Sequence, residues 1–517
     1  MPVTPTYPGL YIEELPSSAC TITAAPTSIA VFVGYSHPFQ TKKFGAAVRI
    51  FGFNEYEREF GGLFKSSRID RQLAYAVHQF FLNGGSVAYV VGLQPKFYDG
   101  SGVNQQDYLA ATVEIPTANL VLTAREPTDA VALTAKLSNI RTSNAVADLQ
   151  LGYGSTGETL RGLDLSITDP TSDDHVVKKI NKLSTLVTAS VGSAGLGATF
   201  PTGTTEFALA FATTPDPSWT TFSANDYVQV FEQDSSLDKV DVFNLLVLPG
   251  VTDALVWANA LAFCEKKRAF LIMDPPANSS ADGAGLGLPL IENQIGSVPK
   301  STNGAFYFPY LRSLDPLDGK ELALPPSGFV AGIYARTDNN RGVWKAPAGL
   351  ETVVNGTTGV VEEGRMTDMR HGVLNPKGIN CLRGFSGIGT VVFGARTLVT
   401  ENRSLQQWRY VPVRRMALFI EQTLLANLGW VVFEPNDEPL WTAIRTSIEG
   451  FMLSLFRQGA FQGGKPSEAF LVKCDSSTTT QDDIDNGKVN IVVGFRPLKP
   501  AEFVIIKISQ LAGQAQS

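Results

Sequence analysis

The strongest constraint on the fold of this 517-residue chain is a pattern that occurs twice: an apolar strand, a helix and a second apolar strand. In the first copy, residues 28–34 (SIAVFVG) are apolar, residues 69–80 carry apolar side chains at helical spacing, and residues 87–91 are apolar again. Gly84 and Gly85 supply a stop after the helix. This order of elements predicts α/β layering.

The second copy of the pattern lies near the middle of the chain. Residues 244–249 (NLLVLP) form an apolar run, a helix is expected over residues 253–267, and residues 269–274 (AFLIMD) form the next strand. This is a βαβ unit, for which a right-handed crossover is expected.

The segment between the two copies has a different composition. Residues 101–235 are rich in Thr, Ser, Ala, Asp and Gly, with short alternating runs such as 120–122 and 227–231. This texture predicts a β-rich insertion with long loops on the outer surface. Its two ends should lie close together, because the α/β pattern resumes directly after it.

A chain of this length is too long for one hydrophobic core, so we expect about two to four domains. The expected fold class is α/β (α+β) and multidomain, with core α/β domains, a β-rich outer insertion and extended N- and C-terminal arms. The expected parts are an N-terminal arm (1–22), the N-terminal part of the core (23–100), the β-rich outer insertion (101–235), an α/β domain (236–380), a C-terminal core domain (381–488) and a C-terminal arm (489–517).

Two amphipathic helices are expected in the last third of the chain. The first covers residues 414–428, and the second begins with Asn436 as its cap and Pro439 in its first turn. The second helix is expected to bury apolar side chains at helical spacing: Trp441, Ile444, Ile448, Phe451 and Leu455.

Both ends of the chain read as extended segments. Residues 10–15 are extended before Pro16, and residues 16–26 are expected to form a flexible linker. A strand is expected over residues 503–508, with Val504, Ile506 and Ile508 on one face. Chain ends normally fray, so an apolar terminal strand needs a sheet to join.

Composition excludes several classes of protein. The formal net charge of -7 disfavours a nucleic-acid binder. The four cysteines (Cys20, Cys264, Cys381, Cys474) lie far apart, which fits neither a zinc site nor a small disulfide framework. No apolar run approaches the roughly 18 residues of a membrane span, and no signal peptide opens the chain. We therefore expect no direct membrane insertion, and a protein assembled in the cytoplasm that leaves it only inside a particle.

Motifs for catalysis, metal binding or cofactor binding are not found. Gly384–Gly387 resembles a nucleophile elbow, but Ile388 stands where that motif requires glycine. The glycine-rich segments lack the spacing of a nucleotide-binding fingerprint. Asp274 follows an apolar strand, where α/β enzymes often keep a carboxylate, although an aspartate that starts a loop is more common. We expect no catalytic residue, no metal and no cofactor.

Two groups of charged residues are candidates for contacts between subunits. Arg336, Asp338 and Arg341 form a cluster that could be a site, or a buried or interfacial ion-pair network. Arg445, Glu449 and Arg457 lie on the polar side of the second predicted helix. They are candidates to face an inner tube or a neighbouring subunit, and the alternative is a solvated helix face.

Five motifs in order resemble the contractile tail sheath protein family. They are TYPGLYIEELPSS with the strand SIAVFVG, FVAGIYARTDNNRGVWKAPAG (329–349), GINCLRGFSGIGTVVFGARTL (378–398), WRYVPVRRMALFIEQTL (408–424) and GFRPLKPAEFVIIKI (494–508). The resemblance covers most of residues 1–95 and 240–510, whereas residues 101–235 match nothing in the family.

The resemblance implies an architecture and a mode of linkage. It implies that the domain at 236–380 is similar to subtilisin in shape, although no Ser-His-Asp arrangement is present. It also implies that N- and C-terminal arms add strands to a sheet in neighbouring subunits. By analogy, this role falls on Tyr7, Leu10, Ile12 and Leu15 at one end, and on Phe503, Val504, Ile506 and Ile508 at the other.

The function that the resemblance implies is that of a structural sheath subunit and not an enzyme. Such a subunit polymerises into a helical tube around an inner tail tube and contracts from a metastable extended state without nucleotide hydrolysis. The implied partners are further copies of the chain, the inner tail tube protein, and baseplate and terminator or cap proteins, within a phage tail or injection particle. The alternatives are an α/β hydrolase-like enzyme with a β-rich appendage and a non-contractile tail structural protein.

Overall fold

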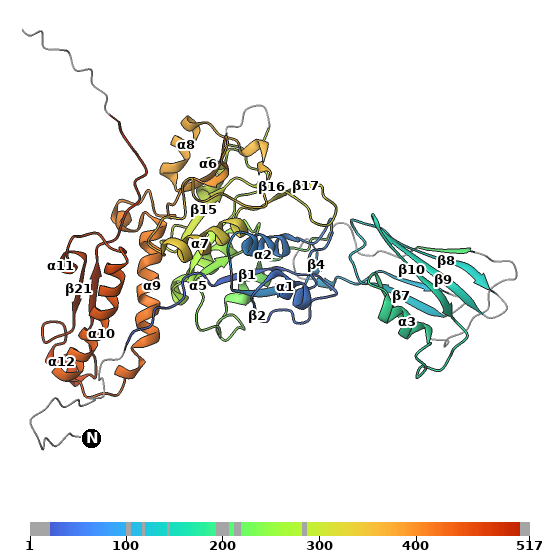
Figure 1. The fold of residues 1–517 in the computed structure, drawn as a ribbon, viewed down its shortest axis with the longest axis horizontal. Helices are drawn as coiled ribbons and strands as arrows, with labels where there is room; N and C mark the ends of the chain where they lie inside the picture. The colour runs from blue at the N-terminus through green and yellow to red at the C-terminus, as the bar shows by residue number, and fades with distance from the viewer. Residues whose placement is uncertain are drawn as a thin grey trace, which may run out of the picture. The chain divides into compact units, whose positions relative to one another are not determined.

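A computed structural model describes residues 21–99, 105–115, 119–141, 145–192, 206–210, 219–281 and 287–506 (Figure 1). The chain divides into two compact units. The α/β unit consists of Thr27–Arg336 and Pro347–Arg403, and the C-terminal unit consists of Met1–Pro26, Thr337–Ala346 and Ser404–Ser517. Mixed helices and sheets in several layers confirm the α/β multidomain class predicted from the sequence.

The α/β unit is built on an eight-stranded sheet. Its strands lie in the order β2 (Ala47–Ile50), β3 (Ala88–Leu93), β1 (Ala30–Tyr35), β13 (Leu245–Val247), β14 (Phe270–Met273), β15 (Gly304–Phe308), β19 (Ile379–Phe385) and β20 (Gly389–Val392). The six central strands are parallel, while β2 and β20 pair antiparallel at the two edges. Both strand–helix–strand patterns therefore form neighbouring parallel strands, as predicted.

The expected domain boundary at 380/381 falls inside β19, which pairs with β15.

Helices pack on both faces of this sheet. On one face, α5 (Ala254–Lys267) packs Val256 and Trp257 into the same core as Leu246 and Leu271. On the other face lie α2 (Gln72–Leu82) and α7 (Ser327–Arg341). There, the hydroxyl groups of Tyr307 and Tyr334 are 2.6 Å apart. Burial on both faces explains why these strands read as continuous apolar runs.

Two glycines allow α7 to lie directly against α2. A Cβ atom at Gly328 would stand 2.6 Å from the Cα atom of Ala76, and one at Gly332 would stand 2.6 Å from the carbonyl oxygen of Phe80. Any larger residue would force the two helices apart, so the close approach depends on the GFVAG spacing.

The β-rich insertion has its own sheets and its own hydrophobic core. One sheet has the order β10 (Thr156–Asp164), β9 (Val146–Tyr153), β8 (Leu133–Arg141), β12 (Glu206–Ala210), and the other the order β11 (Val187–Val191), β7 (Leu120–Ala124), β6 (Thr112–Ile115). The backbones of Tyr98 and Thr220 form an antiparallel bridge, with N–O distances of 2.8 and 3.0 Å. This bridge confirms that the two ends of the insertion lie together.

The interpretation of residues 227–231 as an alternating β run was wrong. They fall in α4 (Ala224–Val228) and the 3-10 turn Gln229–Phe231. Tyr227 and Val230 pack in the core of the α/β sheet and not in the insertion. A five-residue stretch is too short for strand and helix periodicity to be separated.

Shorter elements complete the α/β unit: α1 (Phe53–Phe60), β4 (Lys96–Tyr98), β5 (Gln105–Asp107), α3 (Val176–Leu183), α6 (Ile291–Gln294), β16 (Leu311–Leu314), β17 (Glu321–Leu324), β18 (Gly359–Val360) and α8 (Asp368–Leu374).

The C-terminal unit packs helices on a two-stranded sheet. Its elements are α9 (Val411–Asn427), α10 (Glu438–Arg457), α11 (Pro466–Ala469), β21 (Phe470–Lys473), α12 (Gln481–Asp485) and β22 (Val492–Phe495). The apolar residues predicted for the second helix are all buried in its core. Because β22 pairs with β21, residues 492–495 belong to this unit, and the expected arm at 489–517 began too early.

The helix cap expected at Asn436 lies one residue later. Asp437 accepts the backbone N–H of Leu440 and is the N-cap of α10. The Asn436 side chain instead accepts the indole N–H of Trp441, at 2.9 Å. Both residue types cap helices well, so the sequence alone does not separate them.

A buried ion pair lies at the centre of the C-terminal unit. Arg415 of α9 donates two hydrogen bonds to the Asp338 carboxylate, at 2.8 and 2.6 Å. The side chains are only 3% and 1% exposed. The pair attaches the Thr337–Ala346 segment to α9, because neither charge can be left buried alone.

We predict that Asp338→Ala destabilises the C-terminal unit by about 3–5 kcal/mol, because Arg415 would keep a buried charge without its partner. Denaturant unfolding followed by tryptophan fluorescence measures this loss. As a control in the same unit, Glu438→Ala removes an exposed carboxylate that pairs with Arg445 and should cost less than about 1 kcal/mol. Equal effects of the two substitutions would contradict the prediction.

Candidate assembly interface

Asp274 was considered as a possible catalytic carboxylate because it follows an apolar strand, but its contacts are structural. Asp274 is fully buried at the end of β14. Its carboxylate accepts the backbone N–H of Gly250 at 3.0 Å, and the backbone N–H and hydroxyl of Ser327 at 2.8 and 2.5 Å. The side chain thus joins the turn after β13 to the first turn of α7. Burial outweighs these hydrogen bonds and raises the pKa of Asp274 to about 7.

We predict that this aspartate makes stability depend on pH. Because its folded pKa of about 7 lies above the ordinary value of 3.8, its contribution is complete at low pH and is lost as pH rises from about 4 to about 7. Urea unfolding across this range should show a shallower decline for Asp274→Asn than for the unchanged chain. Parallel profiles for the two proteins would contradict the assignment.

Metal and membrane sites have no support in the part of the chain that the structure describes. No group of three or more His, Cys, Asp or Glu side chains there is placed to hold a metal ion. No helix among those residues is long and apolar enough to cross a membrane.

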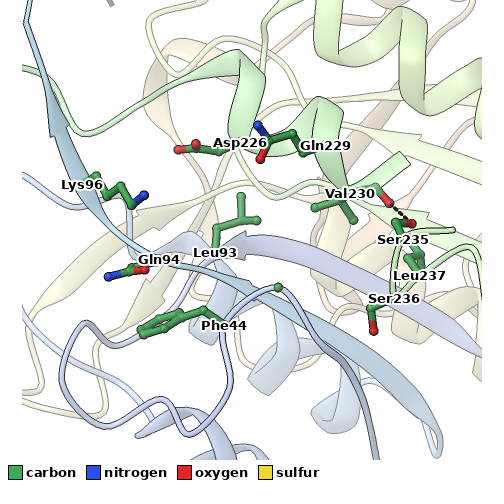
Figure 2. A pocket seen from close by; sticks show the side chains of 11 residues that line it. Phe44, Leu93, Gln94, Lys96, Asp226, Gln229, Val230, Ser235, Ser236 and Leu237 are labelled. Carbon is green, nitrogen blue, oxygen red and sulfur yellow. Dashed lines mark hydrogen bonds between the residues drawn. The ribbon is translucent and has the colours of Figure 1, made fainter. Parts of the chain in front are cut away.

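A small cavity of about 270 Å³ lies beside the base of the insertion (Figure 2). Asp226 lines it, but its carboxylate accepts the hydroxyl groups of Tyr35 and Tyr98, at 2.8 and 2.7 Å. The Ser235 hydroxyl, also at the wall, donates to the carbonyl of Val230. These polar groups satisfy one another and stabilise the junction between β1, β4 and α4, so the cavity is not a strong ligand site.

The carboxyl end of the described chain is an exposed apolar segment, which we call the C-terminal arm (residues 503–506). Phe503, Val504, Ile505 and Ile506 are 74–82% exposed. Within the strand expected over 503–508, the described residues 503–506 have no strand pairing. Ile508 lies outside the described residues, as do Tyr7, Leu10, Ile12 and Leu15 of the predicted N-terminal arm.

The sheet of the C-terminal unit has two open edges. Strands β21 and β22 pair antiparallel with each other, and no third strand joins them within the described residues. One face, including Val472 and Phe495, packs on the core of the unit. The other face presents Leu471 and Val492, each 48% exposed. An open edge beside an apolar face is the arrangement that accepts an added strand.

The start of the described chain is held against α9. Ile22 packs in the core of the C-terminal unit. The backbone N–H and carbonyl of Thr23 both bond to the Asn427 side chain, at 3.0 and 2.8 Å, and the N–H of Ala25 bonds to Thr423. Residues 22–25 are therefore not part of a flexible linker, contrary to the expectation for 16–26.

The candidate charges on α10 differ in their surroundings. Arg445 donates to the carbonyl of Cys474 at 2.5 Å and pairs with Glu438 at 3.3 Å. Glu449 and Arg457 are exposed, and neither forms an ion pair within residues 404–506. Arg445 therefore joins α10 to the end of β21, while Glu449 and Arg457 remain available to a partner.

We predict that Arg445→Glu lowers the thermal midpoint of the C-terminal unit by several degrees, since it removes contacts worth about 1–3 kcal/mol. Glu449→Lys, on the same helix, should leave the midpoint unchanged. Differential scanning calorimetry distinguishes the two. An unchanged midpoint for Arg445→Glu would mean that these contacts do not stabilise the unit.

In the predicted cluster of Arg336, Asp338 and Arg341, the first two residues bond to different partners. Asp338 pairs with Arg415 and is withdrawn from the surface, whereas the Arg336 guanidinium donates to the carbonyl of Val353 at 2.6 Å. Arg341 is exposed at the end of α7. Sequence analysis missed Arg415, although its position four residues from the buried Val411 and Phe419 was a signal that it lies on the core face.

Comparison with known families matches both units. The phage tail sheath protein central domain matches residues 222–398, and the phage tail sheath C-terminal domain matches residues 404–510. The chain belongs to the phage tail sheath protein family. The family resemblance seen in the sequence is thus confirmed.

Sheath proteins of known sequence show limited identity. A putative prophage major tail sheath protein of Pseudomonas aeruginosa strain UCBPP-PA14 is 26% identical over 266 residues, covering 50% of this chain and 62% of that protein. The tail sheath protein of Vibrio phage KVP40 is 23% identical over 198 residues, covering 38% of this chain and 28% of that protein. The matches span less than two thirds of either relative.

Solved sheath structures match over nearly the whole chain. A chain of the anti-feeding prophage baseplate is 26% identical, with a TM-score of 0.58 and coverage of 98% of this chain and 99% of that one. A chain of the contracted helical sheath of the same particle is 25% identical, with a TM-score of 0.57 and coverage of 98% and 100%. This sheath protein therefore shares its fold with subunits of contractile injection systems.

Proposed function

We propose that this sheath protein is a structural subunit that polymerises into a helical tube around an inner tail tube. The tube contracts from a metastable extended state, without nucleotide hydrolysis, and drives the inner tube through a target envelope. The observation that carries the proposal is the combination of an exposed apolar C-terminal arm and an open-edged sheet in one chain.

The arm and the sheet are complementary in chemistry. An extended segment offers backbone N–H and C=O groups that an open edge can pair, and alternating apolar side chains that fix its register. About five ladder hydrogen bonds at about 1 kcal/mol each give a link of roughly 5 kcal/mol before ordering costs. The arm of one subunit pairs with β21 or β22 of a neighbour, and the N-terminal residues Tyr7, Leu10, Ile12 and Leu15 act similarly at the other end.

Such links explain how a sheath can contract and stay continuous. The arm is a tether, so the bodies of two subunits can rotate and slide while the added strand stays in its sheet. Energy stored during assembly is released when the subunits change their mutual contacts, as in other metastable assemblies. Glu449 and Arg457, exposed on α10, face the inner tube or a neighbour in this arrangement.

The proposed partners are further copies of this chain, a baseplate, the inner tail tube protein, and terminator or cap proteins. The similar anti-feeding prophage chains come from a helical sheath and a baseplate, which supports the first two. The particle is a phage tail or an injection system assembled in the bacterial cytoplasm. The chain has a structural and not an enzymatic role there.

Deleting residues 503–517 should abolish assembly without unfolding the protein, because the described part of this segment is exposed. We predict helically striated tubes by negative-stain electron microscopy for the full chain, with the inner tube protein supplied as template where needed. The deleted chain should stay monomeric with an unchanged thermal midpoint.

A matched pair of variants separates the effect of losing backbone hydrogen bonds from the effect of losing apolar side chains. Replacing both Val504 and Ile505 with proline removes one ladder donor whichever edge the arm presents, because consecutive N–H groups point to opposite sides, and should prevent tubes. Replacing both with threonine keeps the donor and should permit them. Tubes that form equally well from the deleted chain would overturn the arm-mediated linkage.

A further inference from the structure

The turn between α9 and α10 exposes two apolar side chains that remain uncovered within the part of the chain that the structure describes. Phe433 is 102% exposed and Val432 is 63% exposed. The same turn anchors Trp430 and Val431 against the core of the C-terminal unit. We call Val432 and Phe433 the turn tip.

The backbone of the tip is also strained. Phe433 has a φ of 72°, a left-handed conformation that is a genuine outlier for a bulky residue. The turn is held by hydrogen bonds from the N–H of Val432 to the carbonyl of Gly429 and from the N–H of Glu434 to the carbonyl of Val431. Strain that aims an aromatic ring at solvent points to a partner that covers the ring.

Acidic residues surround the turn tip. Glu434 follows it directly, and the Asn436 side chain donates to the carbonyl of Lys488, which brings the α12 region alongside. The α12 helix adds Asp482 and Asp485. Lys488 is the nearby base and lies beside Asp483 of α12. Within the described residues, no cation forms an ion pair with the carboxylates of Glu434, Asp482 and Asp485. We call this region the acidic end of the C-terminal unit.

A basic surface lies at the opposite end of α10, about 30 Å away, since this helix has 20 residues at about 1.5 Å each. Lys465 precedes α11, and Arg496 follows β22. The N–H of Gln462 bonds to the carbonyl of Arg496, and the N–H of Arg496 to that of Ala469, which holds these segments together. Figure 1 shows α11 and α12 near opposite ends of α10. Lys465, Arg496 and Arg457 form the basic end, where Glu468 is the nearby acid.

The acidic and basic residues lie at opposite ends of α10. The dipole of this helix favours such a separation of charge but explains only part of it. It accounts for Asp437 and Glu438 in the first turn and Arg457 in the last. It does not account for Glu434, for Lys465, or for an exposed Phe433. These features are explained together if the two ends meet in an assembly.

We propose that the acidic end of one C-terminal unit docks against the basic end of the C-terminal unit in a second copy of this chain. The contact rests on the proposed self-assembly and is separate from strand addition. Phe433 is buried at its centre, and the charges form a rim around it. Two different surfaces that meet head to tail join one copy to the next without closing as a two-fold dimer, which is the type of contact that a helical filament requires.

Charge reversal at each end tests this contact in the full-length protein. The first variant, Glu434→Lys with Asp485→Lys, has two basic ends, and the second, Lys465→Glu with Arg496→Glu, has two acidic ends. Each alone should need at least about tenfold more protein to form tubes. An equimolar mixture should form tubes that contain both, and a chain with all four changes should assemble alone. Single variants that assemble like the unchanged chain, or a mixture no better than either, would overturn the proposal.

Phe433→Gly provides a second test that does not depend on charge. Glycine relieves the positive φ, so the thermal midpoint of the monomer should stay or rise, while the protein concentration needed for assembly should rise about tenfold. Leu183→Ser, which changes a 57% exposed residue of the insertion, is the control. Unchanged assembly of Phe433→Gly would overturn the docking contact. Assembly that survives removal of residues 503–517 is a separate outcome, and it would contradict the arm linkage and not the docking contact.

Discussion

The proposed assembly of this protein depends on backbone N–H and C=O groups that extended segments leave unpaired. The C-terminal arm exposes four consecutive apolar residues. Within the described residues, no further strand pairs with the outer edges of β21 and β22, apart from the bridge between Phe461 and Pro497 beside the end of β22. An isolated soluble protein would normally protect such edges. The proposed assembly uses them, because every copy would offer an arm and also the sheet that can accept the arm of another copy.

The two units of the chain suit different tasks. The parallel sheet of the α/β unit is covered by α5 on one face and by α2 and α7 on the other, which makes it a rigid body. The C-terminal unit carries the arm, the open sheet and the turn tip, and the buried pair of Asp338 and Arg415 stabilises it from within. In the proposed contraction, contacts between subunits that change are thus separate from the packing inside each unit, which stays the same.

The sequence predicted those parts of the fold whose local pattern and burial agree. Asp253 caps α5, and Lys267 ends it, as the apolar spacing indicated. The sequence did not predict contacts between residues that are distant along the chain. For example, nothing near Asp338 identifies Arg415 as its ion-pair partner. The strand predicted for residues 503–508 is a different case. Its apolar residues suit a strand, but a strand needs a partner in a sheet, and the proposed partner belongs to another copy of the chain. The strain at Phe433 is a backbone property that no composition reveals.

Cysteine cross-linking across subunits tests the central claim most directly. The native Cys264, Cys381 and Cys474 are buried, so they would not compete with introduced exposed thiols. Cys20 lies outside the described residues and is replaced by serine in every variant. One cysteine replaces Ile505 in the arm, and a second replaces Val492 or Leu471 in the sheet. Strand addition predicts a ladder of covalent oligomers on oxidation of assembled tubes, and none from either single-cysteine protein. Intact tubes that yield no ladder from either pair would contradict the account.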